Sequence, residues 1–145
     1  MGKILWPGFY LSGQAMDATW EGSAIHAAGL KNLSFLLAWT DAASPVGTVQ
    51  VWATNDPRAA DDDARGHTMA QGQAQWKQLK LPAGSVDVDG ASATWAADDS
   101  AIAITGVGAG RATINLVDLY AFIKLRYVAG SGGTGDTINV SREGN

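Results

Sequence analysis

The chain has little of the material from which catalytic and metal sites are usually built. Its 145 residues contain no cysteine and only two histidines, His26 and His67. Nucleophiles, general bases and metal sites draw mostly on cysteine, histidine and clustered carboxylates. No His-x-His or His-x-x-x-His pair is present, so a zinc site would need ligands from elsewhere in the chain. We therefore expect a protein that is not an enzyme and that binds no metal or cofactor.

Charge and long apolar runs are also scarce. Charged residues make up only 17% of the chain, the net charge is −4, and the ten lysines and arginines are dispersed. Lys124 and Arg126 come nearest to a cluster, and their alternation with apolar residues predicts a solvated strand face. Without a basic patch, we expect no nucleic-acid partner. The first eight residues contain no signal-peptide core and no membrane span, so we expect synthesis in the cytoplasm and no membrane partner.

Short alternating apolar runs, separated by glycine and aspartate, predict an all-β fold. The two clearest runs are residues 33–40 and 48–54. Their inward positions are Phe35, Leu37, Trp39, Val49, Val51 and Ala53, and the outward positions of the second run are Gln50, Trp52 and Thr54. Seven turn-rich residues, 41–47, join the runs, which predicts a hairpin or two adjacent strands.

Further strands are predicted along the rest of the chain. Asp89-Gly90 is typical of a hairpin between residues 86–88 and 91–95. Residues 58–73 form a polar stretch with one helical turn expected at 59–65. The remaining predicted strands are 75–81, 102–104, 113–116, 121–127 and 137–141. Eight to ten strands with turns every 8–12 residues indicate a β-sandwich, jelly-roll-like, in a single domain at residues 13–145.

Two motifs resemble ligand sites but have simpler explanations. Residues 130–135, GSGGTG, match the G-x-G-x-x-G pattern by letter, but a strand rather than a helix follows, so we expect a hairpin turn. Asp61, Asp62 and Asp63 could offer oxygens to calcium, but adjacent side chains point in different directions, which favours a solvated loop.

The N-terminal residues and the six tryptophans supply the candidate contact residues. Residues 1–12 contain Trp6-Pro7 and Phe9-Tyr10, but proline and glycine interrupt them, so we expect an arm or an edge strand that lies on a partner. Trp39 should be in the core, whereas Trp52 points outward and is either covered by a loop or exposed at an interface. The predicted partner contacts are Trp6, Pro7, Phe9, Tyr10 and Trp52.

A resemblance to known proteins follows from two segments. Residues 49–57, VQVWATNDP, followed by WKQL at 76–79, resemble a Q-V-x-x-S/T-N-D-P strand end and a W-x-x-L strand in small virion proteins of tailed bacteriophages. The ending at 121–127 and 130–140 is similar to the W/F-I-R-L-x-Y and S-G-x-G-x-L-x-V ending of the same proteins, with Lys124 in place of arginine. The resemblance implies a non-enzymatic β-sandwich of the capsid decoration (cement) type.

The function expected from this resemblance is the stabilisation of a phage capsid. Such a protein would bind the major capsid protein on the exterior of the virion and would associate with itself as a homodimer or homotrimer. Two other hypotheses remain open: a tail or baseplate module that binds a host carbohydrate or receptor through Trp52 and other exposed rings, and an enzyme with paired carboxylates.

Overall fold

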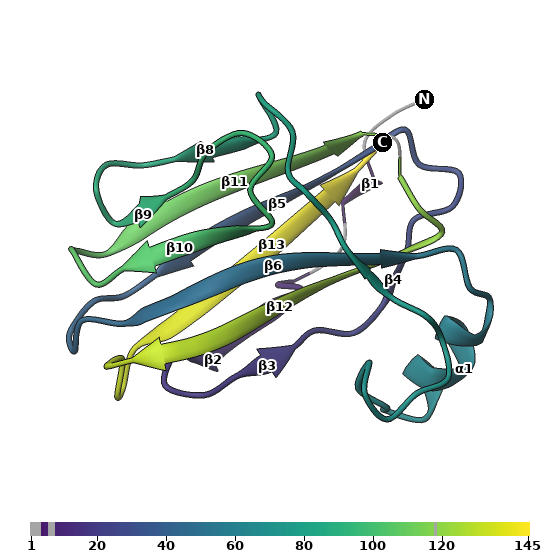
Figure 1. Ribbon diagram of the computed structural model, residues 1–145, viewed down its shortest axis with the longest axis horizontal. Coiled ribbons are helices and arrows are strands. Elements are labelled where there is room, and N and C mark those ends of the chain that lie inside the picture. Colours follow the sequence, from purple (N-terminus) through teal and green to yellow (C-terminus); the bar gives the residue numbers. More distant parts are fainter. Residues whose placement is uncertain (1–3, 6–7, 118) are drawn as a thin grey trace.

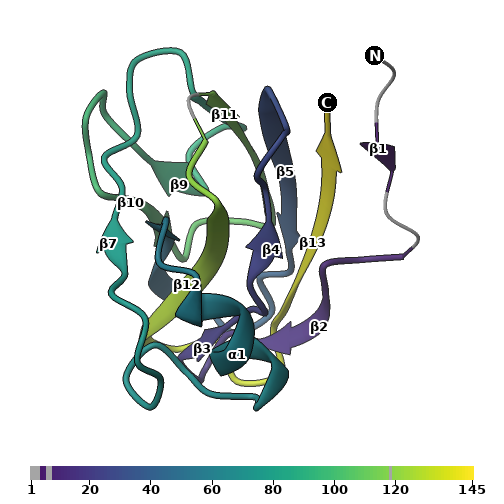
Figure 2. The ribbon, with the colours of Figure 1, turned by 90° about the vertical axis from the view of Figure 1, so that its right-hand side faces the viewer.

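The alternating runs fold into two antiparallel sheets that pack face to face (Figure 1, Figure 2). The computed structural model describes residues 4–5, 8–117 and 119–145. Sheet A contains β1 (Ile4–Leu5), β2 (Leu11–Ala15), β5 (Asn32–Trp39), β8 (Val86–Val88), β11 (Gly110–Val117) and β13 (Thr137–Gly144). Sheet B contains β3 (Trp20–Glu21), β4 (Ile25–His26), β6 (Val46–Thr54), β7 (Lys77–Gln78), β9 (Ala93–Thr94), β10 (Ala101–Thr105) and β12 (Phe122–Ser131).

The predicted all-β sandwich is confirmed, while its jelly-roll connectivity stays a prediction. In sheet A the strands follow the order β1-β13-β5-β11-β8, with β2 also paired to β13. In sheet B the order is β3-β12-β6-β10-β9, with β4 paired to β12 and β7 to β6. The described residues form thirteen strands, and five of these have only two residues, which explains why a pattern search predicts fewer.

The inward faces of the two sheets form one apolar core. Successive side chains of a strand point to opposite faces, so each long strand buries every second residue. Trp39 is 4% exposed, which confirms its predicted place in the core. The other inward residues of the longer strands are buried as well, namely Phe35, Leu37, Val49, Val51, Ala53, Ile102, Ile104, Ile123, Leu125 and Tyr127.

The prediction that residues 33–40 and 48–54 form a hairpin or two adjacent strands is wrong. β5 pairs with β11 and β13 in sheet A, whereas β6 pairs with β10 and β12 in sheet B. The turn-rich residues therefore form an arch that carries the chain from one sheet to the other. Both strands keep their predicted inward faces because each sheet supplies one side of the core.

The glycine run at residues 130–135 forms a second arch, which lies against the first. It joins β12 of sheet B to β13 of sheet A, so the predicted hairpin turn is also wrong. The Gly133 N–H donates to the Ala43 carbonyl of the first arch at 2.8 Å. Gly132 has a φ of 64°, and a Cβ there would collide with the carbonyl oxygens of Ala43 and Ser44. Glycine is required because two backbones meet at this point.

Asp136 ties the two arches together. Its carboxylate accepts hydrogen bonds from the Thr40 hydroxyl at 2.8 Å and from the backbone N–H groups of Ala42 at 2.7 Å and Ala43 at 2.8 Å. Asp136 is only 1% exposed. These bonds, the one from Ala42 above all, lower the pKa of its carboxyl because they favour the charged form.

The predicted hairpin at Asp89-Gly90 is wrong for the same reason as the first. β8 pairs with β11 in sheet A, and β9 pairs with β10 in sheet B. Gly90 does adopt a positive φ of 68°, as the turn prediction requires, but the turn leads into the opposite sheet. A local turn signal thus specified the change of chain direction and not the strand pairing.

One short helix lies at the end of sheet B, and the chain that follows it covers part of the outer face of this sheet (Figure 1). α1 (Arg58–Ala64) confirms the helical turn predicted at 59–65. After it, the chain crosses in front of β12 and β6 before it reaches β7 and the far end of the sandwich (Figure 1). Beneath this cover, Ala59, Ala74 and Phe122 form a small second apolar cluster.

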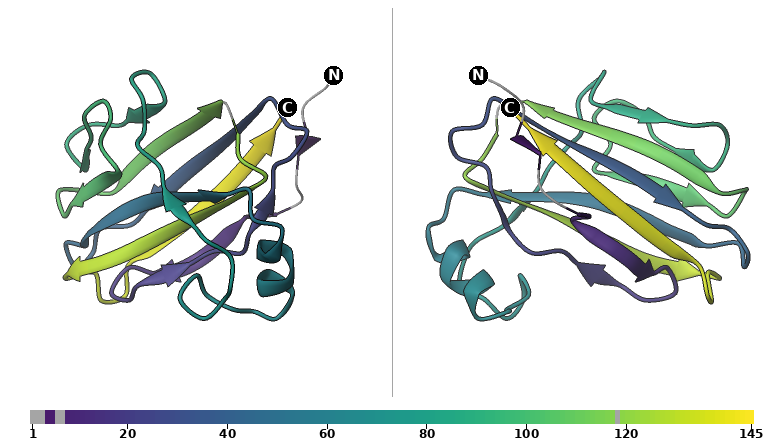
Figure 3. Two further views of the ribbon diagram at one scale, coloured as in Figure 1. Left: turned by 45° about the vertical axis from the view of Figure 1, so that its right-hand side comes forward. Right: turned by 180° about the vertical axis from the view of Figure 1, so that it is seen from behind.

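The N-terminal strands lie along one edge of sheet A, where both pair with β13 (Figure 3). Tyr10, between them, is half-buried and packs on the main core, with its ring 5.8 Å from that of Phe35. Its hydroxyl donates to the carbonyl of Ser23, and burial raises its pKa. Tyr10 therefore joins the edge of sheet A to the chain that follows β3.

Candidate functional site

The outer face of sheet B brings polar and aromatic side chains from three strands together. The register of β6, β12 and β3 places Gln50, Arg126 and Glu21 in one row across the strands. Trp52 and Lys124 form the next row. Both rows face away from the core, because the neighbouring residues on each strand point inward. Solvent exposure of these side chains then depends on the segment that follows α1, because it packs over part of this face.

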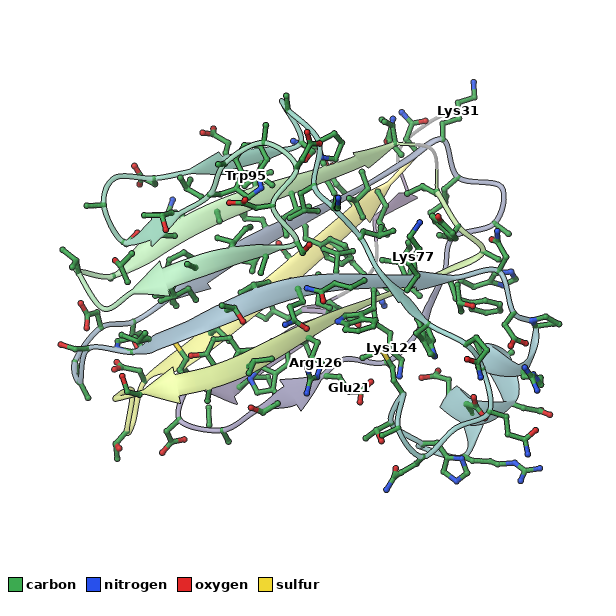
Figure 4. The ribbon with its side chains drawn as sticks, in the orientation of Figure 1. Glu21, Lys31, Lys77, Trp95, Lys124 and Arg126 are labelled. Atoms are coloured by element: carbon green, nitrogen blue, oxygen red, sulfur yellow. The ribbon has the colours of Figure 1, made fainter. Side chains whose placement is uncertain are left out.

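The prediction that Lys124 lies on a solvated strand face is wrong. Lys124 is 3% exposed, and its Nζ donates to Glu21 Oε2 at 3.1 Å. The same ammonium group lies 5.1 Å from the centre of the Trp76 ring. Figure 4 shows Lys124, Glu21 and Arg126 together on this face. Residues after α1 pack over Lys124 and exclude water from it. The sequence of β12 alone contains no signal for this packing.

Glu21 contacts both Lys124 and the loop after α1 that covers this face. Its two carboxylate oxygens accept hydrogen bonds from the Met69 N–H at 3.1 and 3.2 Å. A carboxylate with an ammonium group and a backbone N–H around it is well compensated for its burial. Glu21 therefore anchors the loop to the sheet at one side of the covered region.

Two further anchors fix this loop. Asp62 of α1 is buried, and its Oδ2 accepts from the N–H groups of Gln73 at 2.9 Å and Ala74 at 2.8 Å, so the predicted solvated aspartate loop is wrong at this residue. Thr54, predicted to point outward, is 4% exposed because its hydroxyl donates to the Gln75 carbonyl at 2.6 Å. These bonds set the position of Trp76, the next residue along the chain.

A groove of about 500 Å³ lies where the covering segment meets the sheet. Trp52 is half-buried there, and its indole N–H donates to Gln50 Oε1 at 2.9 Å. Arg126 donates to the same oxygen at 3.4 Å. The residues that line the groove are Glu21, Trp52, Met69, Ala70, Gly72, Ala74, Gln75, Trp76 and Arg126.

The outer face of sheet A is different in character, with mostly short polar side chains and with charged residues at Glu143, Asp87 and Arg111. In register across the sheet, Ser141, Leu36 and Thr113 form one row, and Glu143, Ser34 and Asn115 the next. Leu36 is 49% exposed on β5, between the β11 and β13 members of its row; Figure 3 (right) shows this side of the sandwich. A shallow depression of about 480 Å³ spans both rows and reaches Gly8 of the N-terminal segment.

The predicted contact residues are distributed over both faces. Trp6 and Pro7 lie outside the described residues. Phe9, 57% exposed, follows Gly8 at the rim of the sheet A depression, whereas Tyr10 is packed into the fold. Trp52 lies in the groove on the opposite sheet, half-covered by a loop as one of its two predicted environments required. The structure therefore separates residues that the sequence grouped as one contact set.

Three residues important to these surfaces could not be identified from the sequence. Trp76 could not be placed, Glu21 lies in a two-residue strand too short to recognise, and Leu36 was the outward member of an apolar run. A usable signal existed only for Leu36, since an apolar residue at an outward position of a strand is unusual on a solvated face.

Within residues 4–5, 8–117 and 119–145, no group of three or more histidines and acidic residues is close enough to hold a metal ion. Among the described residues that line the groove, Glu21 is the only carboxylate, and it is engaged by Lys124 and Met69. No helix in the described part of the chain is long and apolar enough to cross a membrane.

Comparison with protein families, with curated proteins and with solved structures found no match for this chain. The fold assignment consequently rests on the strand pairing and core described above. The resemblance of residues 49–57 and 121–140 to phage virion proteins stays a hypothesis, and the function must be argued from the two outer faces.

Proposed function

We propose that the protein is a non-enzymatic structural protein of a tailed-phage virion, of the capsid decoration type. In this proposal it is synthesised in the host cytoplasm, binds the major capsid protein on the capsid exterior and stabilises the shell. Association with itself, as a homodimer or homotrimer, would multiply weak contacts across neighbouring capsid subunits.

The observation that carries the proposal is the outer face of sheet A. Its central rows contain serine, threonine and asparagine around the exposed Leu36, with Glu143 and Asp87 as charged members and Arg111 in the adjacent row. The Ser34 hydroxyl donates to Asn115 Oδ1 at 2.6 Å, so part of the polar surface is already paired within the face. A surface with internally paired polar groups and an exposed leucine loses little solvation when another protein covers it.

The N-terminal segment extends this surface. Phe9 is exposed and follows Gly8, which lines the depression, and exposed aromatic rings are common anchors at protein interfaces. A standard interface covers about 800 Å² on each partner. The proposal therefore places the capsid contact on sheet A and the segment at its edge.

Binding to capsid particles from which the protein has been removed tests the proposal. We expect wild type to co-sediment with the particles and Leu36→Lys and Phe9→Ser to bind at least about tenfold more weakly, since each removes an apolar contact. Val107→Lys is the matched control, because Val107 is 60% exposed in the loop between β10 and β11. Unchanged binding by both Leu36→Lys and Phe9→Ser would refute the assigned contact.

The groove on sheet B supports a second candidate, a tail or baseplate module that binds a host carbohydrate or receptor. Its tryptophan-lined surface suits a small ligand better than a flat protein contact. Immunogold labelling of intact particles distinguishes the candidates, since gold over the whole head indicates decoration and gold confined to the tail indicates the second function.

A further inference from the structure

Trp52 and Arg126 are held in fixed orientations at the mouth of the sheet B groove. Both donate to Gln50 Oε1, at 2.9 and 3.4 Å, so one amide oxygen orients an indole and a guanidinium. Because β6 and β12 pair at these residues, their backbones are also fixed by the sheet. A ligand that contacts both side chains would meet a surface that is ordered before binding, which lowers the entropic cost of association.

Trp76, which also lines the groove, is held in place by a contact with a buried ion pair. Lys124 lies against the Trp76 ring, and Glu21 compensates the charge of Lys124 at 3.1 Å. Because Lys124 and Glu21 neutralise each other, they leave little net charge beneath the groove. Arg126 forms no ion pair with a carboxylate in the described part of the chain, although Glu21 lies opposite it in register, and its guanidinium lines the groove.

The groove therefore combines two indole rings with one planar guanidinium donor, that of Arg126. An indole face is apolar and electron-rich, so it favours C–H groups that carry a small positive charge. A guanidinium donates two or more parallel hydrogen bonds to hydroxyl or carboxylate oxygens. A pyranose ring presents both features at once, with C–H groups on one face and oxygens around its edge. The groove volume of about 500 Å³ lies in the usual range for small-ligand sites.

We propose that this groove binds a saccharide, with a pyranose ring on Trp52, Trp76 as the flanking wall and Arg126 hydrogen-bonded to hydroxyl or carboxylate oxygens of the sugar. The inference deepens the second candidate function, because it assigns that function's ligand class to specific side chains. It holds equally for a protein on the capsid, since the groove is on the sheet opposite the proposed capsid contact.

Other occupants fit these observations less well. Nucleic acid needs several cations along a strand, whereas Arg126 is the only cation among the described residues that line the groove. A proline-rich peptide would stack on tryptophan, but its recognition relies on apolar slots between parallel rings and makes less use of an oriented guanidinium. The saccharide is the occupant that uses both indoles and Arg126.

The test is titration of the intact protein with two sets of oligosaccharides, followed by nuclear magnetic resonance of the indole N–H groups. Neutral chito-oligosaccharides and cello-oligosaccharides form the first set, and oligogalacturonates form the second. We expect at least one set to bind. Binding should shift the indole N–H resonances of Trp52 and Trp76 and leave those of the other tryptophans unchanged. Because this readout uses wild type, it does not depend on the folding of any variant.

Variants assign the roles of the side chains. Trp52→Ala should weaken binding at least about tenfold, whereas Trp52→Phe should retain part of it because an aromatic face remains. Phe9→Ala, which removes an exposed ring from the other side of the molecule, is the matched control and should bind as wild type does. Arg126→Gln should weaken the acidic set more than the neutral one, with Arg111→Gln on the exposed face of β11 as its control.

Three results would overturn the inference: no binding of either set, indole shifts away from Trp52 and Trp76, or equal affinity of wild type and Trp52→Ala. Binding of a polyproline peptide in the groove with no saccharide binding would assign the groove to peptides instead. Capsid co-sedimentation is measured separately, so a failure of saccharide binding with intact capsid binding rejects the saccharide site alone.

Discussion

The buried pair Lys124–Glu21 offers the sharpest test of how the outer face of sheet B is held together. The side chains are 4% and 14% exposed, and their charged atoms are 3.1 Å apart. At an effective dielectric constant of about 20, two unit charges at this distance attract by about 5 kcal/mol, and the cost of removing both from water offsets most of this. Keeping the pair is nearly neutral, whereas breaking it leaves one charge buried without its partner.

We therefore expect Lys124→Met and Glu21→Gln each to lower the free energy of unfolding by about 3 kcal/mol, at the lower end of the range for broken buried pairs. The lower end applies because Glu21 retains the Met69 N–H and some contact with water. The double variant Glu21→Gln/Lys124→Met should be more stable than either single variant, since it buries no charge. Additive effects would instead lower its stability by about 6 kcal/mol.

Urea unfolding of the four proteins, followed by circular dichroism, measures these differences. The pair of Arg58 and Asp56, whose side chains are 53% and 15% exposed, is the control; because Arg58 is exposed, Arg58→Gln should lower the stability much less than either single variant of the buried pair. If the double variant is less stable than both single variants, Lys124 and Glu21 are not coupled through charge. Charge compensation by Glu21 would then not explain the burial of Lys124.

Three further predictions concern the edge, the loop and the arches. Gly22→Ala should lower the free energy of unfolding by about 2 kcal/mol in urea, because its Cβ would collide with the Tyr10 ring. Thr54→Val should cost about 1–2 kcal/mol in the same assay, since it removes the hydrogen bond to Gln75. For Asp136, the folded pKa lies below the unfolded value near 3.9, so its stabilisation is complete above about pH 4 and is lost as the pH falls through the folded pKa. Asp136→Asn should therefore be less stable at pH 7 and should lose less stability between pH 5 and pH 2, as thermal unfolding over that range would show.

Inward and outward positions on the strands could be predicted from the sequence because alternation is a local property. Phe35, Leu37 and Trp39 face the core whatever their strand pairs with, since successive side chains of any strand point to opposite faces. The short helix at 58–64 was also predictable from local sequence. Pro57 ends the preceding strand, and the polar residues after it do not alternate as a strand would.

Strand pairing could not be predicted in this way. Residues 41–47 change the direction of the chain in a hairpin and in an arch alike, and the inward faces of β5 and β6 are the same in both. The choice between them depends on β11 and β13, which occupy the edges of β5 and come from the far end of the chain. Asp136 and Gly133 then stabilise the arch from the same distant region.

The same distinction between local sequence and tertiary packing applies to the candidate site. The sequence by itself determined that Trp52 and Lys124 point away from the core, because each occupies an outward position on a long alternating strand. Only the tertiary structure decided that Lys124 is buried against Trp76 while Trp52 borders a groove, since both outcomes depend on the segment after α1 and on Glu21. Strand alternation specifies the side of a sheet, and the environment on that side is set by whichever distant part of the chain packs over it.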